Sequence, residues 1–206
     1  MLIHEMEQRS DEWHAVRVGK ITGTSFTTMA NGKKDTIEKL CLQTAAEKLT
    51  GRSCESGYTN AAMENGCETE ALGRQAYEAT QLVHVAEVGF IELDEYIGCS
   101  PDGLVGGDGG FELKCPMAHT HLGYLLEPKK LVVTYKWQVQ GFLWVTGRAW
   151  IDVVSFNELF PPDKQLLIVR VLPDADAFEK LEAGADYCRK RIAEILNGVT
   201  DGVQTT

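Results

Sequence analysis

The stretch Cys99-Ser100-Pro101-Asp102-Gly103 and, after a glycine-rich turn, Phe111-Glu112-Leu113-Lys114-Cys115-Pro116 together decide the fold. In the second part Glu112 and Lys114 alternate with apolar residues, which is the period-two pattern of a strand. One face of this strand is therefore apolar, and the other presents a carboxylate and an ammonium group together. Asp102 joins them if the chain before the turn at 106–110 pairs antiparallel with the strand after it.

Two carboxylates and one lysine in a small volume indicate a metal site with chemistry beside it. Carboxylate oxygens and water are ligands that suit magnesium and manganese. Such a metal can activate a water and stabilise a phosphoryl transition state, and a nearby lysine can position or deprotonate that water. Taken separately the two parts are weak, because a Glu-x-Lys strand is often a surface ion pair and Pro-Asp-Gly is a common turn.

Four helices are expected before this stretch. The first is a short helix that Ser10 caps and that runs to about Val18, and the second is capped by Thr22 and carries Phe26 and Met29. The third begins at a capping box of Asp35 and Glu38 and runs to Leu49. The fourth covers residues 61–80.

In the fourth helix Glu70 and Arg74 share a face with apolar residues, spaced three and four apart along the chain. A carboxylate on a largely apolar stripe is costly unless something pairs with it. Either Arg74 pairs with Glu70 across one turn, or Glu70 has a role at a site.

The later pattern predicts an α/β fold in one domain, residues 1–206, with a central mixed sheet flanked by helices. Strands are expected at 88–93, 96–100 and 110–115, with the glycine-rich turn joining the last two. Residues 132–147 suggest a helix. The strands after it are 150–156 and 166–172, and a final helix runs from a cap at Asp174 to Asn197-Gly198. The run from 110 to 156 is a strand–helix–strand crossover, which is expected to be parallel.

The composition argues partly against a nucleic-acid partner. The net charge is −10, whereas phosphate binding favours Lys and Arg, but a basic groove can lie on an acidic body.

No apolar run approaches a membrane span, and the first residues contain no signal-peptide core, so we expect a cytoplasmic protein with no membrane partner. The six cysteines lack zinc spacing and are expected to be reduced thiols.

The order of these motifs resembles a known family. Pro101-Asp102 followed by Glu112-Leu113-Lys114 looks like the PD-(D/E)xK nuclease signature, which implies a restriction-endonuclease-like core. The surroundings are similar to the phage lambda exonuclease and YqaJ-type viral recombinase family. They comprise the segments 12–22, 65–74, 99–104, 112–116 and 138–146.

This resemblance implies a role for individual residues. Asp102, Glu112 and the Leu113 carbonyl are expected to bind Mg²⁺, with Mn²⁺ as a substitute, and Glu70 to contact the metal or its water. Lys114 and Gln138 are expected to act on the attacking water.

Further residues match positions that hold the DNA end. Arg17, Thr24 and, more loosely, Lys34 match positions at the 5′-phosphate. Met63 matches a wedge at the terminal base pairs, or it is an ordinary core residue.

The same resemblance implies a metal-dependent exonuclease that digests linear double-stranded DNA from 5′ ends to mononucleotides and leaves a 3′-ended single strand. It further implies a ring-shaped homotrimer in a bacterial host cell, encoded by a phage or prophage, that works with a single-strand annealing protein in recombination. Three alternatives stay open: an endonuclease on the same fold, a DNA-binding protein without catalysis, and an unrelated acidic regulatory domain. An intact set of Glu70, Asp102, Glu112 and Lys114 argues against the second, and the ordered motifs argue against the third.

Overall fold

The computed structural model describes residues 1–54 and 61–202, and the side chains of 1–54 and 69–199. Its elements are β1 (Leu2–His4), α1 (Asp11–Arg17), the 3-10 turn η1 (Gly23–Ser25), α2 (Phe26–Asn31), α3 (Lys34–Thr50), α4 (Ala61–Gln81), β2 (Val85–Ala86), β3 (Phe90–Glu92), β4 (Gly98–Cys99), β5 (Gly103–Val105), β6 (Gly109–Lys114), α5 (Ala118–Leu126), α6 (Pro128–Thr134), α7 (Lys136–Thr146), β7 (Trp150–Phe156), the 3-10 turn η2 (Pro162–Lys164), β8 (Leu166–Val171) and α8 (Ala175–Gly202).

The larger sheet has five strands in the order β2-β5-β6-β7-β8. All neighbours are antiparallel except β6 and β7, which are parallel, as the crossover between them predicts. The expected α/β fold with a mixed sheet is therefore confirmed. A smaller sheet, β1-β3-β4, lies beside it. Among the described residues, no helix combines the length and apolar character needed to cross a bilayer.

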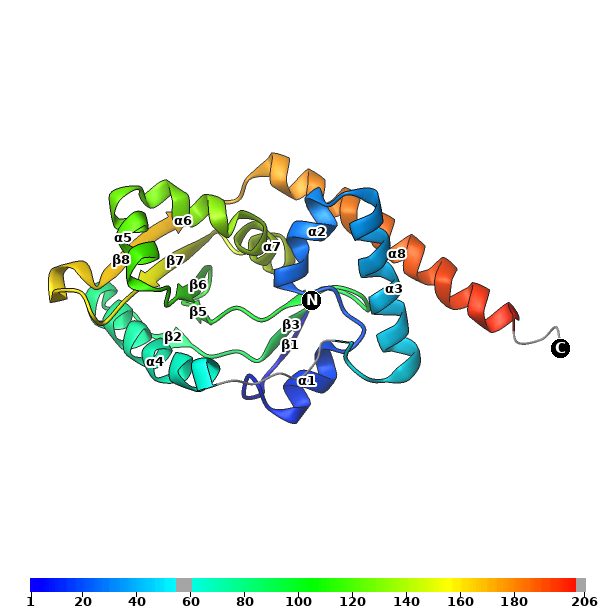
Figure 1. Ribbon diagram of the computed structural model, residues 1–206, viewed down its shortest axis with the longest axis horizontal. Helices are drawn as coiled ribbons and strands as arrows, with labels where there is room; N and C mark the ends of the chain where they lie inside the picture. Colours follow the sequence, from blue (N-terminus) through cyan, green and yellow to red (C-terminus); the bar gives the residue numbers. More distant parts are fainter. Residues whose placement is uncertain (55–60, 203–206) are drawn as a thin grey trace.

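Helices cover both faces of the larger sheet (Figure 1). On one face Tyr77 of α4 packs against Phe111 and Leu113 of β6 in a small core. On the other face α7 packs so closely that a Cβ added at Gly110 would meet the Phe142 ring at 2.2 Å. The strand β6 therefore presents Glu112 to the face that α7 covers and its apolar residues to α4, as its alternation predicts.

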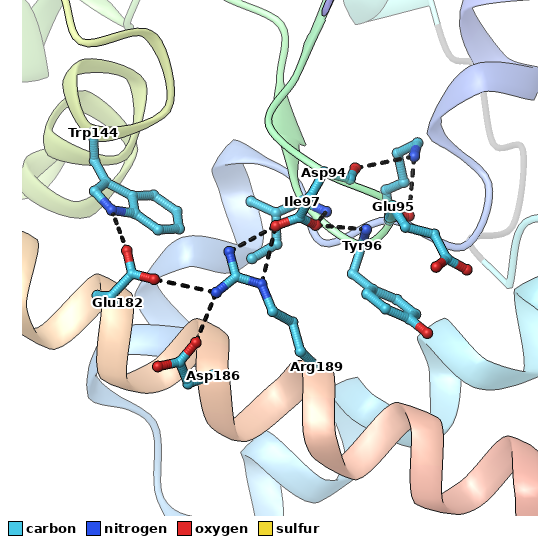
Figure 2. Close-up of polar contacts among 9 residues, drawn as sticks. Asp94, Glu95, Tyr96, Ile97, Trp144, Glu182, Asp186 and Arg189 are labelled. Carbon is cyan, nitrogen blue, oxygen red and sulfur yellow. Dashed lines mark hydrogen bonds and ion pairs between the residues drawn. The ribbon is translucent and has the colours of Figure 1, made fainter. Parts of the chain in front are cut away.

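The long helix α8 is tied to the rest of the chain by the polar contacts in Figure 2. Arg189 donates to Asp94, which follows β3, with Nη2 and Oδ2 2.6 Å apart. The same guanidinium contacts Asp186 and Glu182 of α8, and Glu182 accepts a hydrogen bond from Trp144 of α7 at 2.9 Å. These contacts hold α8 against the elements that carry the site.

Four expectations about helices need correction. The predicted helix 132–147 is two helices that break at Tyr135, and α5 precedes them. The third helix begins at Lys34 without a side-chain cap, so the capping box of Asp35 and Glu38 is wrong. Glu38 instead binds Arg191 of α8. Thr22 likewise makes no capping bond, and α8 extends to Gly202.

The strand expected at 96–100, and its expected pairing with the strand after the glycine-rich turn, also need correction. Only Gly98–Cys99 is a strand, and it pairs with β3 in the smaller sheet. The partner of β6 across the glycine-rich turn is β5, which pairs Gly103 with Phe111. The antiparallel hairpin that the site requires is present, but its first strand begins after Asp102.

Candidate active site

Asp102 and Glu112 are brought together by the β5–β6 hairpin. Asp102 lies directly before β5, and its Oδ2 accepts a hydrogen bond from the Leu113 backbone N–H at 2.8 Å. This bond holds the Asp102 carboxylate beside the strand that carries Glu112. The arrangement is the one that the alternating pattern of β6 predicts.

Glu112 is the buried centre of the site, with 3% of the residue exposed. Its Oε1 accepts a hydrogen bond from Lys114 Nζ at 2.5 Å and another from Gln138 Nε2 at 2.6 Å. Lys114 comes from the same face of β6, and Gln138 comes from α7. The close approach of α7 to the sheet thus places the Gln138 amide on the same carboxylate oxygen that accepts from Lys114.

Burial and like charge set the protonation of the pair. Burial, reinforced by the negative charge of Asp102, raises the pKa of Glu112 to about 8. Burial also raises the pKa of Asp102, although Lys114 opposes the shift. The pKa of Lys114 would fall through burial alone, but Glu112 and Asp102 outweigh that effect and raise it. Two buried carboxylates with raised pKa values favour a cation between them.

The residues present fit a hard divalent metal. Within the described part of the chain, no three His, Cys, Asp or Glu side chains gather as a metal site. The hydrogen bonds described for the pair go to Oε1 of Glu112 and Oδ2 of Asp102. The second oxygen of each carboxylate, with the Leu113 carbonyl and water, would make an all-oxygen donor set of the kind that magnesium and manganese prefer.

Glu70 of α4 lies near this pair but is bound elsewhere. Its negative charge contributes to the raised pKa values of Asp102 and Glu112. Its carboxylate pairs with Arg9, with Nη2 and Oε2 3.0 Å apart, and Arg74 pairs with Glu87. The expected alternative of a Glu70–Arg74 pair is therefore wrong. Glu70 and Asp102 line a common cavity of about 500 Å³ on the α4 side of the site.

A second cavity, of about 50 Å³, adjoins Glu112 and Gln138 on the α7 side. Arg17 and Thr24 line it. The Arg17 guanidinium lies 4.0 Å from the centre of the Trp13 ring, and its Nη1 donates to Ser100 Oγ at 3.2 Å. The structure therefore places Arg17 and Thr24 in one cavity with Glu112.

The remaining two expected DNA contacts are not brought into this cavity. Lys34 is exposed at the start of α3 and is not among the residues that line either cavity. Its charge acts on Glu38 of the same helix. The side chain of Met63 lies outside the described residues.

The comparisons with known proteins agree with this geometry. The model of the YqaJ-like viral recombinase domain matches residues 12–149, more than half of the chain. The chain belongs to this family. The match includes Asp102, Glu112, Lys114 and Gln138, and membership supports a nuclease role in recombination.

Three solved structures that are similar to this YqaJ-like domain are exonucleases. LHK-Exo in complex with dAMP is 28% identical, with 95% of this chain and 98% of that chain covered and a TM-score of 0.84. The alkaline exonuclease LHK-Exo from Laribacter hongkongensis is 30% identical, with 93% and 99% covered and a TM-score of 0.77. A phage-related exonuclease from Haemophilus somnus 129PT, 15% identical with 87% and 96% covered and a TM-score of 0.72, shares the fold. Among curated proteins, none matches the chain.

Three residues at the site of this YqaJ-like domain were not predicted to act there: Trp13, Ser100 and Arg9. Ser100 Oγ accepts hydrogen bonds from both Arg17 and Trp13, the latter at 2.9 Å. The position of Ser100, two residues before Asp102, was a usable signal, because a residue so close to a candidate metal ligand is expected to lie at the site. The partnership of Arg9 with Glu70 joins residues 61 positions apart and left no signal in the local pattern.

Proposed function

We propose that this chain is a magnesium-dependent deoxyribonuclease that degrades linear double-stranded DNA in the 5′→3′ direction. It releases mononucleotides and leaves a 3′-ended single strand for recombination by strand annealing. The observation that carries the proposal is the position of Glu112. Its carboxylate adjoins Asp102 and Lys114 on one side, and on the other it lines the cavity that contains Arg17.

The residues of the chain divide the work of phosphodiester hydrolysis. When bound, magnesium would activate a water and neutralise charge that develops on the phosphate. Asp102, Glu112 and the Leu113 carbonyl would hold it. Gln138 and Lys114 fix the orientation of Glu112 through Oε1, and Lys114 Nζ positions the attacking water. A cation at the carboxylates would lower the pKa of Lys114, because the negative charge of Glu112 and Asp102 raises that pKa when no cation is bound.

The cavity beside Arg17 supports an end-binding role. A guanidinium and the Ser100 hydroxyl are donors that suit a terminal phosphate, and Thr24 adds a hydroxyl at the rim. A site for a terminal phosphate next to the cleavage centre favours removal of one nucleotide at a time. The dAMP bound to LHK-Exo is a deoxynucleoside monophosphate, the class of product that this reaction releases. An endonuclease has no need of such a pocket.

Arg17→Ala is expected to reduce the preference for 5′-phosphorylated over 5′-hydroxyl ends by about tenfold or more, since a charge-assisted hydrogen bond contributes roughly 1.5–3 kcal/mol. The measurement is kcat/KM on the two duplexes, which differ only in that phosphate. Lys34→Ala, assayed in parallel, separates the two candidate phosphate contacts. An unchanged preference in Arg17→Ala, with a loss in Lys34→Ala, would move the phosphate site to α3.

The assembly belongs to the same proposal. We infer a homotrimeric ring around DNA that acts with a single-strand annealing protein, on the strength of the family resemblance. Such a ring would reconcile the net charge of −10 with DNA binding, because only the groups that face the DNA need to be basic. The mass of the protein in solution, with and without duplex DNA, tests the trimer.

The requirement for an end tests the proposed activity against the endonuclease alternative. With magnesium, a linear duplex is expected to be degraded, while the same sequence as a covalently closed circle stays intact. Cutting of the closed circle would mean that the carboxylate site cleaves internal bonds, and the exonuclease assignment would be wrong.

A further inference from the structure

Arg9 adopts a backbone conformation that an arginine rarely occupies. Its φ is +71°, in the left-handed region that favours glycine. The residues on both sides of it are anchored. The Gln8 side chain donates to the backbone carbonyls of Val88 and Pro101, each at 2.8 Å, and Ser10 caps α1. Gln8 thus fixes the turn to the residue directly before Asp102. A strained residue held in place beside a reactive site suggests a functional reason for the strain.

The side chain of Arg9 reaches Glu70. Its Nη2 contacts both carboxylate oxygens, at 3.2 and 3.0 Å. Both side chains are about half exposed, 52% for Arg9 and 44% for Glu70, so water screens the pair and it adds little to the stability of the fold. The ion pair therefore does not account for the strained turn as a stabilising feature. Both residues line the cavity that Asp102 and Leu113 also line.

We propose that Arg9 is a positioning residue that holds Glu70 beside the Asp102–Glu112 pair and competes with a divalent cation for its carboxylate. The inference rests on the proposed function, because it concerns the metal that Asp102 and Glu112 would hold. With Glu70 bound to Arg9, the described side chains form no three-carboxylate metal site. Release of Glu70 from Arg9 would supply the third carboxylate.

The exposure of the pair makes this exchange possible at low cost. A guanidinium in a half-exposed pair is a weak competitor, whereas a divalent cation between two buried carboxylates attracts a third strongly. Arg9 thus keeps the negative charge of Glu70 balanced while no metal is bound, and the anchored turn keeps it within reach. A purely structural ion pair would not make the effect of Arg9 on metal affinity depend on the Glu70 carboxylate.

The test is Mn²⁺ binding to the full chain without DNA, by isothermal titration calorimetry. Arg9→Gly and Arg9→Asn both remove the charge, and both residues tolerate a positive φ. Each is expected to lower the Mn²⁺ dissociation constant about two- to fivefold. This is the change in affinity that corresponds to the free energy of a surface ion pair. In a Glu70→Gln background the same substitutions are expected to leave the constant unchanged. The matched control is Arg191→Gln, which breaks the ion pair between Arg191 of α8 and Glu38 of α3 and is expected to have no effect.

Unchanged or weaker Mn²⁺ binding in both Arg9 variants would overturn the proposal, as would an equal gain in the Glu70→Gln background. Asp102→Ala separates this failure from that of the proposed function. Mn²⁺ binding that survives Asp102→Ala would show that the proposed metal site is wrong, and the role of Arg9 would be lost with it. Loss of binding in Asp102→Ala, with no gain in the Arg9 variants, would overturn the role of Arg9 alone.

Discussion

Lys114→Ala is expected to slow hydrolysis of duplex DNA by roughly a thousandfold, the scale of a lost general acid–base group. The Lys114 ammonium group donates a hydrogen bond to Glu112, with Nζ 2.5 Å from Oε1. It also lies over the Tyr135 ring, with Nζ 4.8 Å from the ring centre. Its removal leaves Asp102, Glu112 and Gln138 in place. Metal binding and DNA binding are therefore expected to persist, because loss of a neighbouring positive charge favours a cation at the carboxylates.

Single-turnover cleavage of an end-labelled duplex measures this effect, and fluorescence anisotropy with the same duplex measures binding. Lys130→Ala is a suitable control, since Lys130 is an exposed lysine paired with Glu127 on the surface. Cleavage by Lys114→Ala within a few-fold of the unaltered chain would remove Lys114 from the reaction. Loss of binding together with cleavage would instead mean that Lys114 holds DNA.

Removal of divalent metal is expected to stop cleavage completely, and added magnesium to restore it. At rest, burial and Asp102 raise the pKa of Glu112, so without a cation the pair does not carry its full negative charge at neutral pH. A bound divalent metal supplies two effects at once: it generates a nucleophile from water, and it neutralises charge on the phosphate. We expect the side chains of the site not to supply both without it.

The measurement compares initial rates in chelator and after magnesium is added in excess of it. Circular dichroism in chelator checks that the chain stays folded, so that lost activity reports on the site. Cleavage that continues in chelator would contradict the metal mechanism as a whole and would leave the Asp102–Glu112 pair without its proposed role.

The strand that decides the fold could be predicted from sequence, because strand periodicity is strict. Phe111 and Leu113 face one side and Glu112 and Lys114 the other, and one turn suffices to bring Asp102 beside them. The parallel β6–β7 pair followed from the rule for crossovers. Local patterns therefore placed the carboxylates and the lysine, and the family resemblance supplied Gln138 and Arg17.

The rest depended on contacts between distant parts of the chain. The short strand β5 forms because β2 and β6 pair with it on its two sides, whereas the Pro-Asp-Gly sequence at its start resembles a turn. Pro128 begins α6 and was a usable signal for a helix start that the predicted helix at 132–147 missed. Glu38 and Glu70 both had plausible local partners, yet they pair with arginines 153 and 61 positions away. Local spacing does not reveal such pairs.

The most direct test of the proposed function follows a label from each end of a linear duplex in magnesium, with Asp102→Ala as the inactive control. The proposal predicts that the 5′ label appears first, as a mononucleotide, while the 3′ label stays on long single strands, and that neither is released by Asp102→Ala. Early release of the 3′ label, or fragments longer than one nucleotide from the 5′ end, would contradict the proposed direction and mode of cleavage.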